Sequence, residues 1–352
     1  MFASSIAEEL WSVSPETALR LESRTDRGFA FTSFDGRGFT IIGGDSAGHV
    51  PEVFPDLVDE IDDSAAKASE TLRSVVDETL RLVRDFRFAR PLRLRAFSRV
   101  RAVSSGRGSH RDESLLLALT SGSASEAVSV IATPGSLESD LALLRVADMS
   151  SMDFDYRIVP LLFVNGSGAV LLHEAIGHPS QSGKDPSAKP EWLEVADDPS
   201  FPSLGAITVD DCGLPVQSTV LNGGQSPAAW RRESFRDVPA RRMTNLVVRC
   251  STQPVAALPS PRMEILLVGG GHYDSLTDQI VLTISRAALV SDDRRTPVRP
   301  FTLVENRETV LKSLRGSRGD LTSYPGVICF EEGHRVPVGS ASPDLLLEPL
   351  AG

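Results

Sequence analysis

The most regular pattern of hydrophobic positions lies over residues 72–86. Five apolar side chains and one threonine recur there at i, i+3, i+4, i+7, i+11 and i+14, which is the spacing of one helical face. The acidic segment 52–63 precedes this pattern and basic residues begin in its last turns, an order that suits the helix dipole. The sequence therefore predicts an amphipathic helix whose buried face comprises Leu72, Val75, Val76, Thr79, Val83 and Phe86.

Period-two alternation over residues 92–103 predicts a β-strand. Apolar side chains at positions 92, 94, 96, 100 and 102 share one face, and the arginines at 93, 95, 99 and 101 share the other. Two interpretations of this arginine face stay open: a solvated surface that pairs with acidic neighbours, in this chain or a partner, and an anchor for an anionic substrate. Nucleic-acid binding is disfavoured because no aromatic series is interleaved for base stacking.

Further apolar runs predict strands at 114–120 and 127–132 and then, between Gly and Pro turns, at 206–209, 265–268, 280–284 and 336–338. The segment 184–205 is rich in Pro, Ser and Asp and predicts a long loop. At about 150 residues per domain, 352 residues suggest two domains. We expect an α+β fold, with a shortened mixed α/β N-terminal domain over 1–150 and a largely antiparallel β domain over 151–352. A helix over the segment that follows residue 164 would lie at their junction.

Composition narrows the class of protein. A net charge of −11 makes general nucleic-acid binding unfavourable. No stretch approaches the roughly 18 continuous apolar residues of a membrane span, and Glu8 and Glu9 stand where a signal peptide needs a basic start. Three cysteines are too few for a disulfide scaffold and favour a reducing compartment. We therefore expect a cytoplasmic protein with no membrane association.

The segment 170–178 carries the most informative chemistry. An apolar strand pattern over 158–164 leads through a Gly-containing turn into a helical pattern with His173, Glu174 and His178. Imidazole is a favoured zinc ligand, and a Glu next to the first ligand can take a proton from metal-bound water, as in the H-E-x-x-H helix of metallopeptidases. The alternative is a pair of unrelated polar residues at a helix end.

The spacing in this chain, H-E-x-x-x-H, is one residue longer than in that motif. Five residues of a regular α-helix turn by about 500°, which leaves the two imidazoles roughly 140° apart. They can share a metal only if the helix widens to a π-type turn or ends between them. Gly177 and Pro179, on either side of the second histidine, make such an irregularity plausible.

Two other glycine-containing segments imitate catalytic loops. Residues 44–48 fit G-x-S-x-G, but the prolines at 51 and 55 argue against the helix that a nucleophile elbow requires, so we interpret the segment as a hairpin turn. Residues 269–272, Gly-Gly-Gly-His, lack the ending and spacing of a phosphate loop, and we expect another turn. His272 and the other lone histidines are expected to be surface or hydrogen-bonded residues.

The His-Glu-Ala-Ile-Gly-His segment resembles the signature of the TldD/PmbA family of metallopeptidases. Three later regions resemble family motifs in the same order: 208–215 the I-D-D-x-G-x-P turn, 231–234 with 242–245 the R-R-E-S…R-M-T-N pair, and 329–339 the C-G-K-x-G-Q-x-V-P-V-G tail. The resemblance covers about 160 to 345, and the first 150 residues match weakly. It implies Zn²⁺ held by His173, His178 and Cys329, with Glu174 as the general base on zinc-bound water.

The resemblance also implies a hydrolase that cleaves amide bonds in short or unfolded peptides or peptide-like metabolites. It implies a dimer, either of like chains or with a related subunit that lacks the zinc motif. Arg231, Arg242, Asn245 and His334 are candidate substrate-binding residues, although the arginine motifs could equally be structural. Cys212 and Cys250 are the competing thiols, which we expect to be structural.

Departures from the family pattern keep two rival functions open. Gln181 stands where the family often has Glu, Phe330 and His334 replace a Gly and a Gln, and the loop 179–205 diverges. One rival is a non-catalytic partner subunit that binds metal. The other is a small-molecule amide hydrolase in a biosynthetic pathway.

Overall fold

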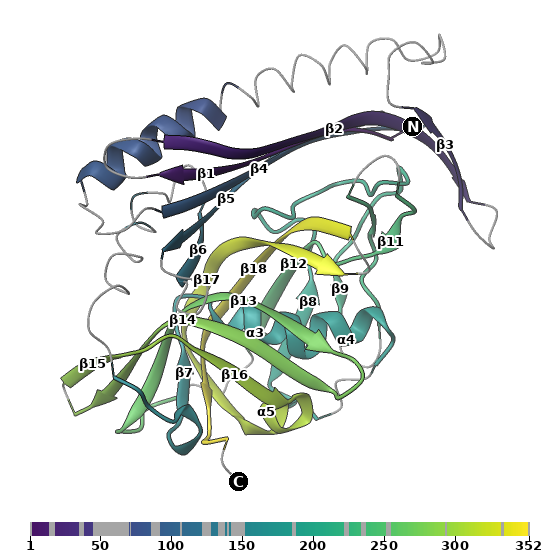
Figure 1. Ribbon diagram of the computed structural model, residues 1–352. Coiled ribbons are helices and arrows are strands. Elements are labelled where there is room, and N and C mark those ends of the chain that lie inside the picture. Colours follow the sequence, from purple (N-terminus) through teal and green to yellow (C-terminus); the bar gives the residue numbers. More distant parts are fainter. Residues whose placement is uncertain are drawn as a thin grey trace.

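The computed structural model arranges the chain as two β-sheets. Figure 1 shows the N-terminal sheet arched over a larger sheet, whose strands surround the helices α3 and α4. Buried apolar residues from both parts belong to one hydrophobic cluster. The structure describes residues 2–13, 18–34, 39–44, 70, 72–85, 92–105, 108–121, 128–132, 138, 141, 152–184, 188–221, 225–233, 237–250, 255–292, 294–331 and 334–350.

The N-terminal sheet has six antiparallel strands in the order β3-β2-β1-β4-β5-β6. The predicted strands at 92–103, 114–120 and 127–132 are confirmed, since they lie in β4, β5 and β6 up to the described bounds. The strands are β1 (Phe2–Val13), β2 (Ala18–Phe34), β3 (Phe39–Gly44), β4 (Leu92–Ser105), β5 (Gly108–Ser121) and β6 (Val128–Ala132).

The predicted amphipathic helix is also confirmed, over residues 72–85. Its expected inner face is buried, and the Thr79 hydroxyl donates to the carbonyl oxygen of Val75, so this polar group is satisfied inside the helix. Phe86 lies outside the described residues.

The larger sheet follows the order β15-β14-β13-β7-β18-β12-β8-β9, with β16 on β14 and β17 on β18. Two pairs, β12–β18 and β13–β7, are parallel and the others are antiparallel, so the largely antiparallel second half is confirmed. Its strands are β7 (Leu161–Phe163), β8 (Leu193–Asp197), β9 (Thr219–Val220), β12 (Asn245–Cys250), β13 (Arg262–Asp274), β14 (Gln279–Ser291), β15 (Arg294–Val298), β16 (Phe301–Asn306), β17 (Leu314–Glu331) and β18 (His334–Leu347). A separate hairpin pairs β10 (Trp230–Arg231) with β11 (Ala240–Arg241).

Three local predictions were wrong. Residues 206–209 form no strand and contribute one isolated bridge, from Val209 to Pro215. The expected loop 184–205 contains β8, whose inner residues are buried against β12. Residues 269–272 are not a turn, because they continue β13 past three register irregularities.

Short helices follow β7 and position the candidate motif. The chain leaves β7 through Asn165 and Gly166, both with positive φ, and enters α3 (Gly168–Leu172), a π-helical turn (His173–Gly177) and α4 (His178–Gln181). Two further helices are α5 (Arg307–Ser313) and a 3-10 turn (Tyr156–Ile158). No helix among the described residues is long and apolar enough to cross a membrane.

The α+β fold class is therefore confirmed. The expected domain boundary between 150 and 151 falls outside the described residues, so the division into 1–150 and 151–352 stays a prediction.

Candidate metal centre

A widened helical turn brings the two histidines of the motif together. His173–Gly177 is a π-helical turn, and the backbone N–H of His178 donates to the carbonyl oxygen of His173, five residues back. The extra residue offsets the rotation that would separate the side chains in a regular α-helix, so the ring centroids lie 4.8 Å apart at 88°. Gly177 suits this turn because a Cβ there would lie 2.3 Å from the sulfur of Met243.

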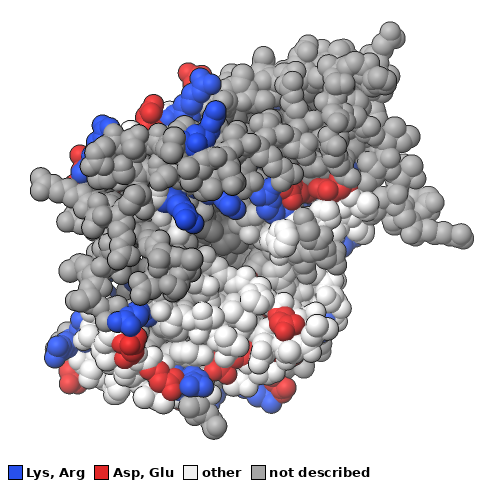
Figure 2. Space-filling model, in the orientation of Figure 1, with Lys and Arg blue, Asp and Glu red and all other residues white. Residues whose placement is uncertain are grey.

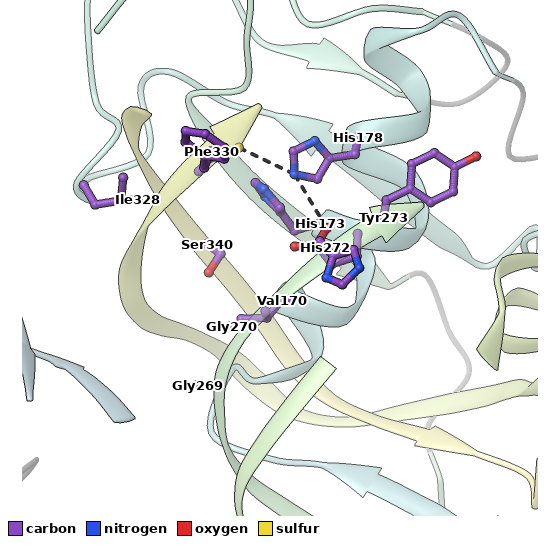
Figure 3. A pocket seen from close by; sticks show the side chains of 13 residues that line it. Val170, His173, His178, Gly269, Gly270, His272, Tyr273, Ile328, Phe330 and Ser340 are labelled. Carbon is purple, nitrogen blue, oxygen red and sulfur yellow. Dashed lines mark hydrogen bonds and ion pairs between the residues drawn. The ribbon is translucent and has the colours of Figure 1, made fainter. Parts of the chain in front are cut away.

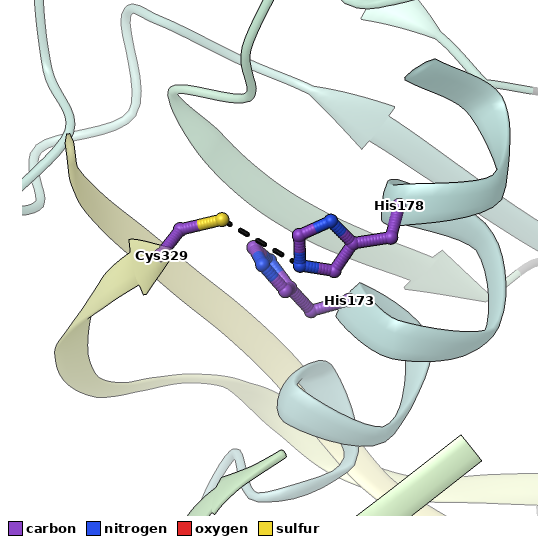
Figure 4. Close-up of side chains that lie close together, drawn as sticks. All are labelled: His173, His178 and Cys329. Carbon is purple, nitrogen blue, oxygen red and sulfur yellow. Dashed lines mark hydrogen bonds between the residues drawn. The ribbon is translucent and has the colours of Figure 1, made fainter. Parts of the chain in front are cut away.

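Strand β17 adds a thiol to the two imidazoles. Cys329 is buried near the end of β17, and its Sγ lies 3.5 Å from Nε2 of His178. One ligand atom from each of the three residues falls within 4.8 Å of the others, as Figure 4 shows. We call His173, His178 and Cys329 the ligand cluster.

The surroundings favour the thiolate form of Cys329. Burial alone would raise the pKa of its thiol, but hydrogen bonds and positive charge from His173 and His178 hold that pKa well below its usual range. Arg242 lies on the other side, where its Nη2 donates to both the carbonyl oxygen and the sulfur of Cys329 at 3.2 Å. The sulfur is therefore held as an anionic donor.

Glu174 lies beside the ligand cluster. Its side chain is buried, and Oε2 lies 3.6 Å from Nε2 of His178. Among the described residues, neither this oxygen nor Nδ1 of His173 has a hydrogen-bond partner. Burial raises the pKa of Glu174, and the neighbouring histidines oppose that rise.

The donor set fits a zinc ion. Two nitrogens and one thiolate are the ligand types that zinc prefers, and three protein ligands leave a fourth tetrahedral position for water or substrate. The unpaired buried atoms of His173 and Glu174 are costly in a dry interior, and a cation between the ligands would make their placement favourable.

A cavity of about 290 Å³ opens onto the ligand cluster. Figure 3 shows it between the helical segment, β13 and the end of β17. Its lining comprises Val170, His173, Glu174, His178, Gly269, Gly270, Gly271, His272, Tyr273, Ile328, Cys329, Phe330 and Ser340.

Glycines let β13 approach Glu174. A Cβ at Gly271 would lie 3.0 Å from Cγ of Glu174 and 2.6 Å from a methyl group of Leu282. Tyr273 lies two residues after Gly271 on β13. Its hydroxyl donates to Asp278 at 2.6 Å and accepts from Lys184 at 2.5 Å. This wall of the cavity is therefore held firmly.

The contribution of β13 to the cavity was not predicted. Residues 269–272 were expected to form a turn and His272 to be a lone histidine, yet all four residues line the cavity. The run of three glycines before a histidine was the available signal, because such a run permits close backbone approach. Ser340, which also lines the cavity, had no comparable signal.

Two of the four candidate substrate-binding residues support the framework and do not line this cavity. Nη1 of Arg231 donates to the carbonyl oxygens of Met243 and Pro337, each at 2.7 Å. Asn245 is fully buried, with Oδ1 accepting from the backbone N–H of Gly205 and Gly339. These contacts favour the structural alternative for both residues.

The other two candidates lie on the far side of Cys329. Arg242 contacts Cys329 directly and also donates to the carbonyl oxygen of His334 at 3.2 Å. Nδ1 of His334 lies 3.4 Å from Asp237, and neither Arg242 nor His334 lines this cavity. Arg242 therefore lies beside Cys329, one of the three residues of the ligand cluster.

The competing thiols do not join a ligand group within the described chain. Burial raises the pKa of Cys212 to about 12, and it also raises the pKa of Cys250. Both thiols are therefore weak metal ligands at neutral pH.

Gln181 ends α4, and its Oε1 is buried.

The arginine-bearing face of β4 divides into two halves. Arg93 and Arg95 are exposed. Figure 2 shows Lys and Arg side chains on both the upper and the lower part of this face of the molecule. Arg99 and Arg101 are buried against Asp211 in the second half of the chain. The expected pairing with an acidic neighbour therefore holds for Arg99 and Arg101, but the expectation of a solvated surface was wrong for them, because both side chains are buried.

Comparison with known proteins agrees with the motifs. No family model matches the chain. Three curated proteins are each named "Metalloprotease TldD homolog": two from Buchnera aphidicola, subspecies Schizaphis graminum and Acyrthosiphon pisum, and one from Haemophilus influenzae. They are 25%, 26% and 26% identical over 59%, 60% and 58% of the chain, and the matches cover 50% of each relative. The chain thus spans about half the length of the curated relatives it matches.

Solved structures share the fold along nearly the whole chain. TldE from Thermococcus kodakarensis superposes with a TM-score of 0.62 at 13% identity, covering 99% of this chain and 95% of that one. A putative modulator of a DNA gyrase from Thermotoga maritima gives 0.63 at 11% identity, covering 99% and 94%. The chain is thus similar in sequence to TldD metalloprotease homologues and shares its fold with TldE. These similarities agree with the resemblance to the TldD/PmbA family seen in the motifs.

Proposed function

We propose that this chain is a zinc-dependent peptidase or amidase of the TldD/PmbA family, with the ligand cluster as its metal site. The observation that carries the proposal is the gathering of His173, His178 and Cys329 within 4.8 Å beside the buried carboxylate of Glu174. The curated relatives named as metalloproteases support it.

The roles of the residues follow from their positions. A bound zinc ion supplies Lewis acidity that activates a water molecule and polarises the scissile carbonyl. Glu174, whose Oε2 makes no protein hydrogen bond, accepts the proton from the attacking water and returns it to the leaving amine. Burial raises the pKa of Glu174, and the charges of the neighbouring histidines oppose that rise.

The substrates proposed are short or unfolded peptides or peptide-like metabolites. A small-molecule amide hydrolase is the second candidate, favoured by the size of the cavity, because about 290 Å³ lies at the small end of ligand pockets. We also propose the two-domain division at 150 and a dimer, of like chains or with a related subunit.

Zinc content tests the metal site. Wild-type protein purified without chelators should carry about one zinc per chain, and Cys329→Ala should lose most of it. Cys212→Ala is the matched control and should keep its zinc, because Cys212 lies outside the ligand cluster. A folded wild type that takes up no zinc even from added metal contradicts the proposal.

Glu174→Gln tests the base. This variant should keep its zinc and lose about 10²–10⁴-fold in amide hydrolysis, the range for loss of a general base. Unchanged activity with zinc bound would instead support a non-catalytic, metal-binding partner subunit.

A further inference from the structure

Ser340 presents a buried hydroxyl at the wall of the cavity. Its side chain is 1% exposed and belongs to the lining. Among the described residues, its Oγ makes no hydrogen bond. Figure 3 shows Ser340 on β18, away from His178 and Tyr273.

The backbone around Ser340 is paired on both sides. Ser340 pairs with Tyr324 of β17 on one side and with Leu246 of β12 on the other, so it lies in the interior of the sheet. The nearby lining residues Val170 and Ile328 are apolar and offer no hydrogen bond. An unpaired hydroxyl here is unfavourable, and an alanine or valine would avoid the cost.

We propose that Ser340 is a specificity-determining residue that hydrogen-bonds a hydroxyl on the substrate, namely the side chain of Ser or Thr next to the scissile amide. This inference rests on the proposed function. The same cavity holds the ligand cluster and Ser340, so a group bound at Ser340 belongs to a residue that flanks the reacting bond.

The chemistry of the wall decides which group fits. Apart from Glu174 beside the ligand cluster, the lining residues that the structure describes include no Asp, Glu, Lys or Arg, so a charged side chain would lose its hydration without a countercharge from them. A carboxamide carries two donors and an acceptor and would leave most of them unpaired against one hydroxyl. A single hydroxyl is satisfied, because the hydroxyl of Ser340 can donate or accept.

Matched peptides test the assignment. Thr and Val have nearly the same shape, so peptides with Thr or Val at each position flanking the scissile amide differ in one hydroxyl. At one of these positions wild type should cleave the Thr peptide with about tenfold higher kcat/KM. Ser340→Ala should bring that ratio close to one while zinc content stays unchanged.

Ser342→Ala is the matched control. Ser342 lies two residues along β18, is also buried with an unpaired Oγ, and does not line the cavity. This variant should keep the wild-type preference for Thr. Equal cleavage of both peptides by wild type, or a preference that survives in Ser340→Ala, would overturn the assignment.

Binding separates this inference from the proposed function. Calorimetry of the same peptides with the Glu174→Gln variant measures recognition without turnover. A Thr preference in binding, lost on adding Ser340→Ala, with no hydrolysis by wild type would refute the peptidase and keep the subsite. Hydrolysis without any Thr preference would refute the subsite alone.

Discussion

Two buried polar regions of this molecule differ in how their groups are satisfied. We call Asp211, Arg99 and Arg101 the framework cluster. Both carboxylate oxygens of Asp211 accept hydrogen bonds, one from Arg101 and one from the backbone N–H of Arg232. In the ligand cluster and the adjoining wall, acceptors on Glu174 and Ser340 make no hydrogen bond to the described protein. The carboxylate of Asp211 is thus saturated by the protein and helps to hold the fold together, whereas Oε2 of Glu174 faces the cavity without a protein donor and is available to a ligand.

Among the substitutions considered, loss of the Asp211 carboxylate is expected to lower the free energy of unfolding most. Asp211→Ala would leave Arg99 and Arg101 buried without their shared counter-ion, and we expect a loss of about 3–5 kcal/mol in the free energy of unfolding. Urea unfolding measures the change. Asp153→Ala, which removes an exposed partner of Arg299, should leave the midpoint unchanged, and equal behaviour of both variants would contradict the distinction.

Asp197 sharpens the comparison because its direct hydrogen-bond donors are neutral. Its Oδ1 accepts from the backbone N–H and the hydroxyl of Thr244, and burial raises its pKa to about 6 from an ordinary value of 3.8. The folded state thus keeps this proton up to a higher pH than the unfolded state does. The contribution of Asp197 to stability is fully favourable below about pH 4 and falls as pH rises through 6, by up to about 3 kcal/mol.

Asp197→Asn tests this pH dependence, since Oδ1 is kept and the ionisation is removed. The variant should be more stable than wild type at pH 7 and close to it at pH 4. Urea unfolding of both proteins at both pH values gives the difference, in which other titrating groups cancel. A difference that is the same at both pH values would show that Asp197 does not ionise near pH 6.

Arg242 is a buried residue outside the framework cluster, and its side chain contacts the sulfur of a proposed ligand. Arg242→Lys keeps the charge and loses the planar fork, so we expect about tenfold weaker zinc binding with little change in stability. Competition with a chelator measures the affinity. Arg241→Lys, on the neighbouring exposed residue that stacks on Trp230, should bind zinc like wild type. Equal affinities in both variants would remove Arg242 from the metal site.

Local periodicity made much of the fold predictable. The helix over 72–85 and the alternation along β4 depend on which face is buried, and a short window of sequence contains that information. The isolated strand expected at 206–209 failed because no neighbouring strand extends alongside it beyond one bridge. Such pairing depends on distant segments and is invisible locally.

The candidate site, like the fold, was predictable where a short stretch of sequence contains the signal. The motif identified His173, Glu174 and His178, and the requirement for a widened turn followed from helix geometry. The burial of Arg99 could not be foreseen, since Asp211 is more than a hundred positions away. Ser340 is a common residue in a common context, and only its place in the cavity distinguishes it.

The widened turn at His173–Gly177 also affects how such proteins are found. It amounts to a single-residue insertion that the helix absorbs locally, so the shorter H-E-x-x-H pattern and this longer one can present the same pair of imidazoles. A genome search that fixes the gap between the histidines at one length would separate chains whose sites are geometrically alike. A search that permits one inserted residue, where a glycine precedes the second histidine, would find chains of both kinds.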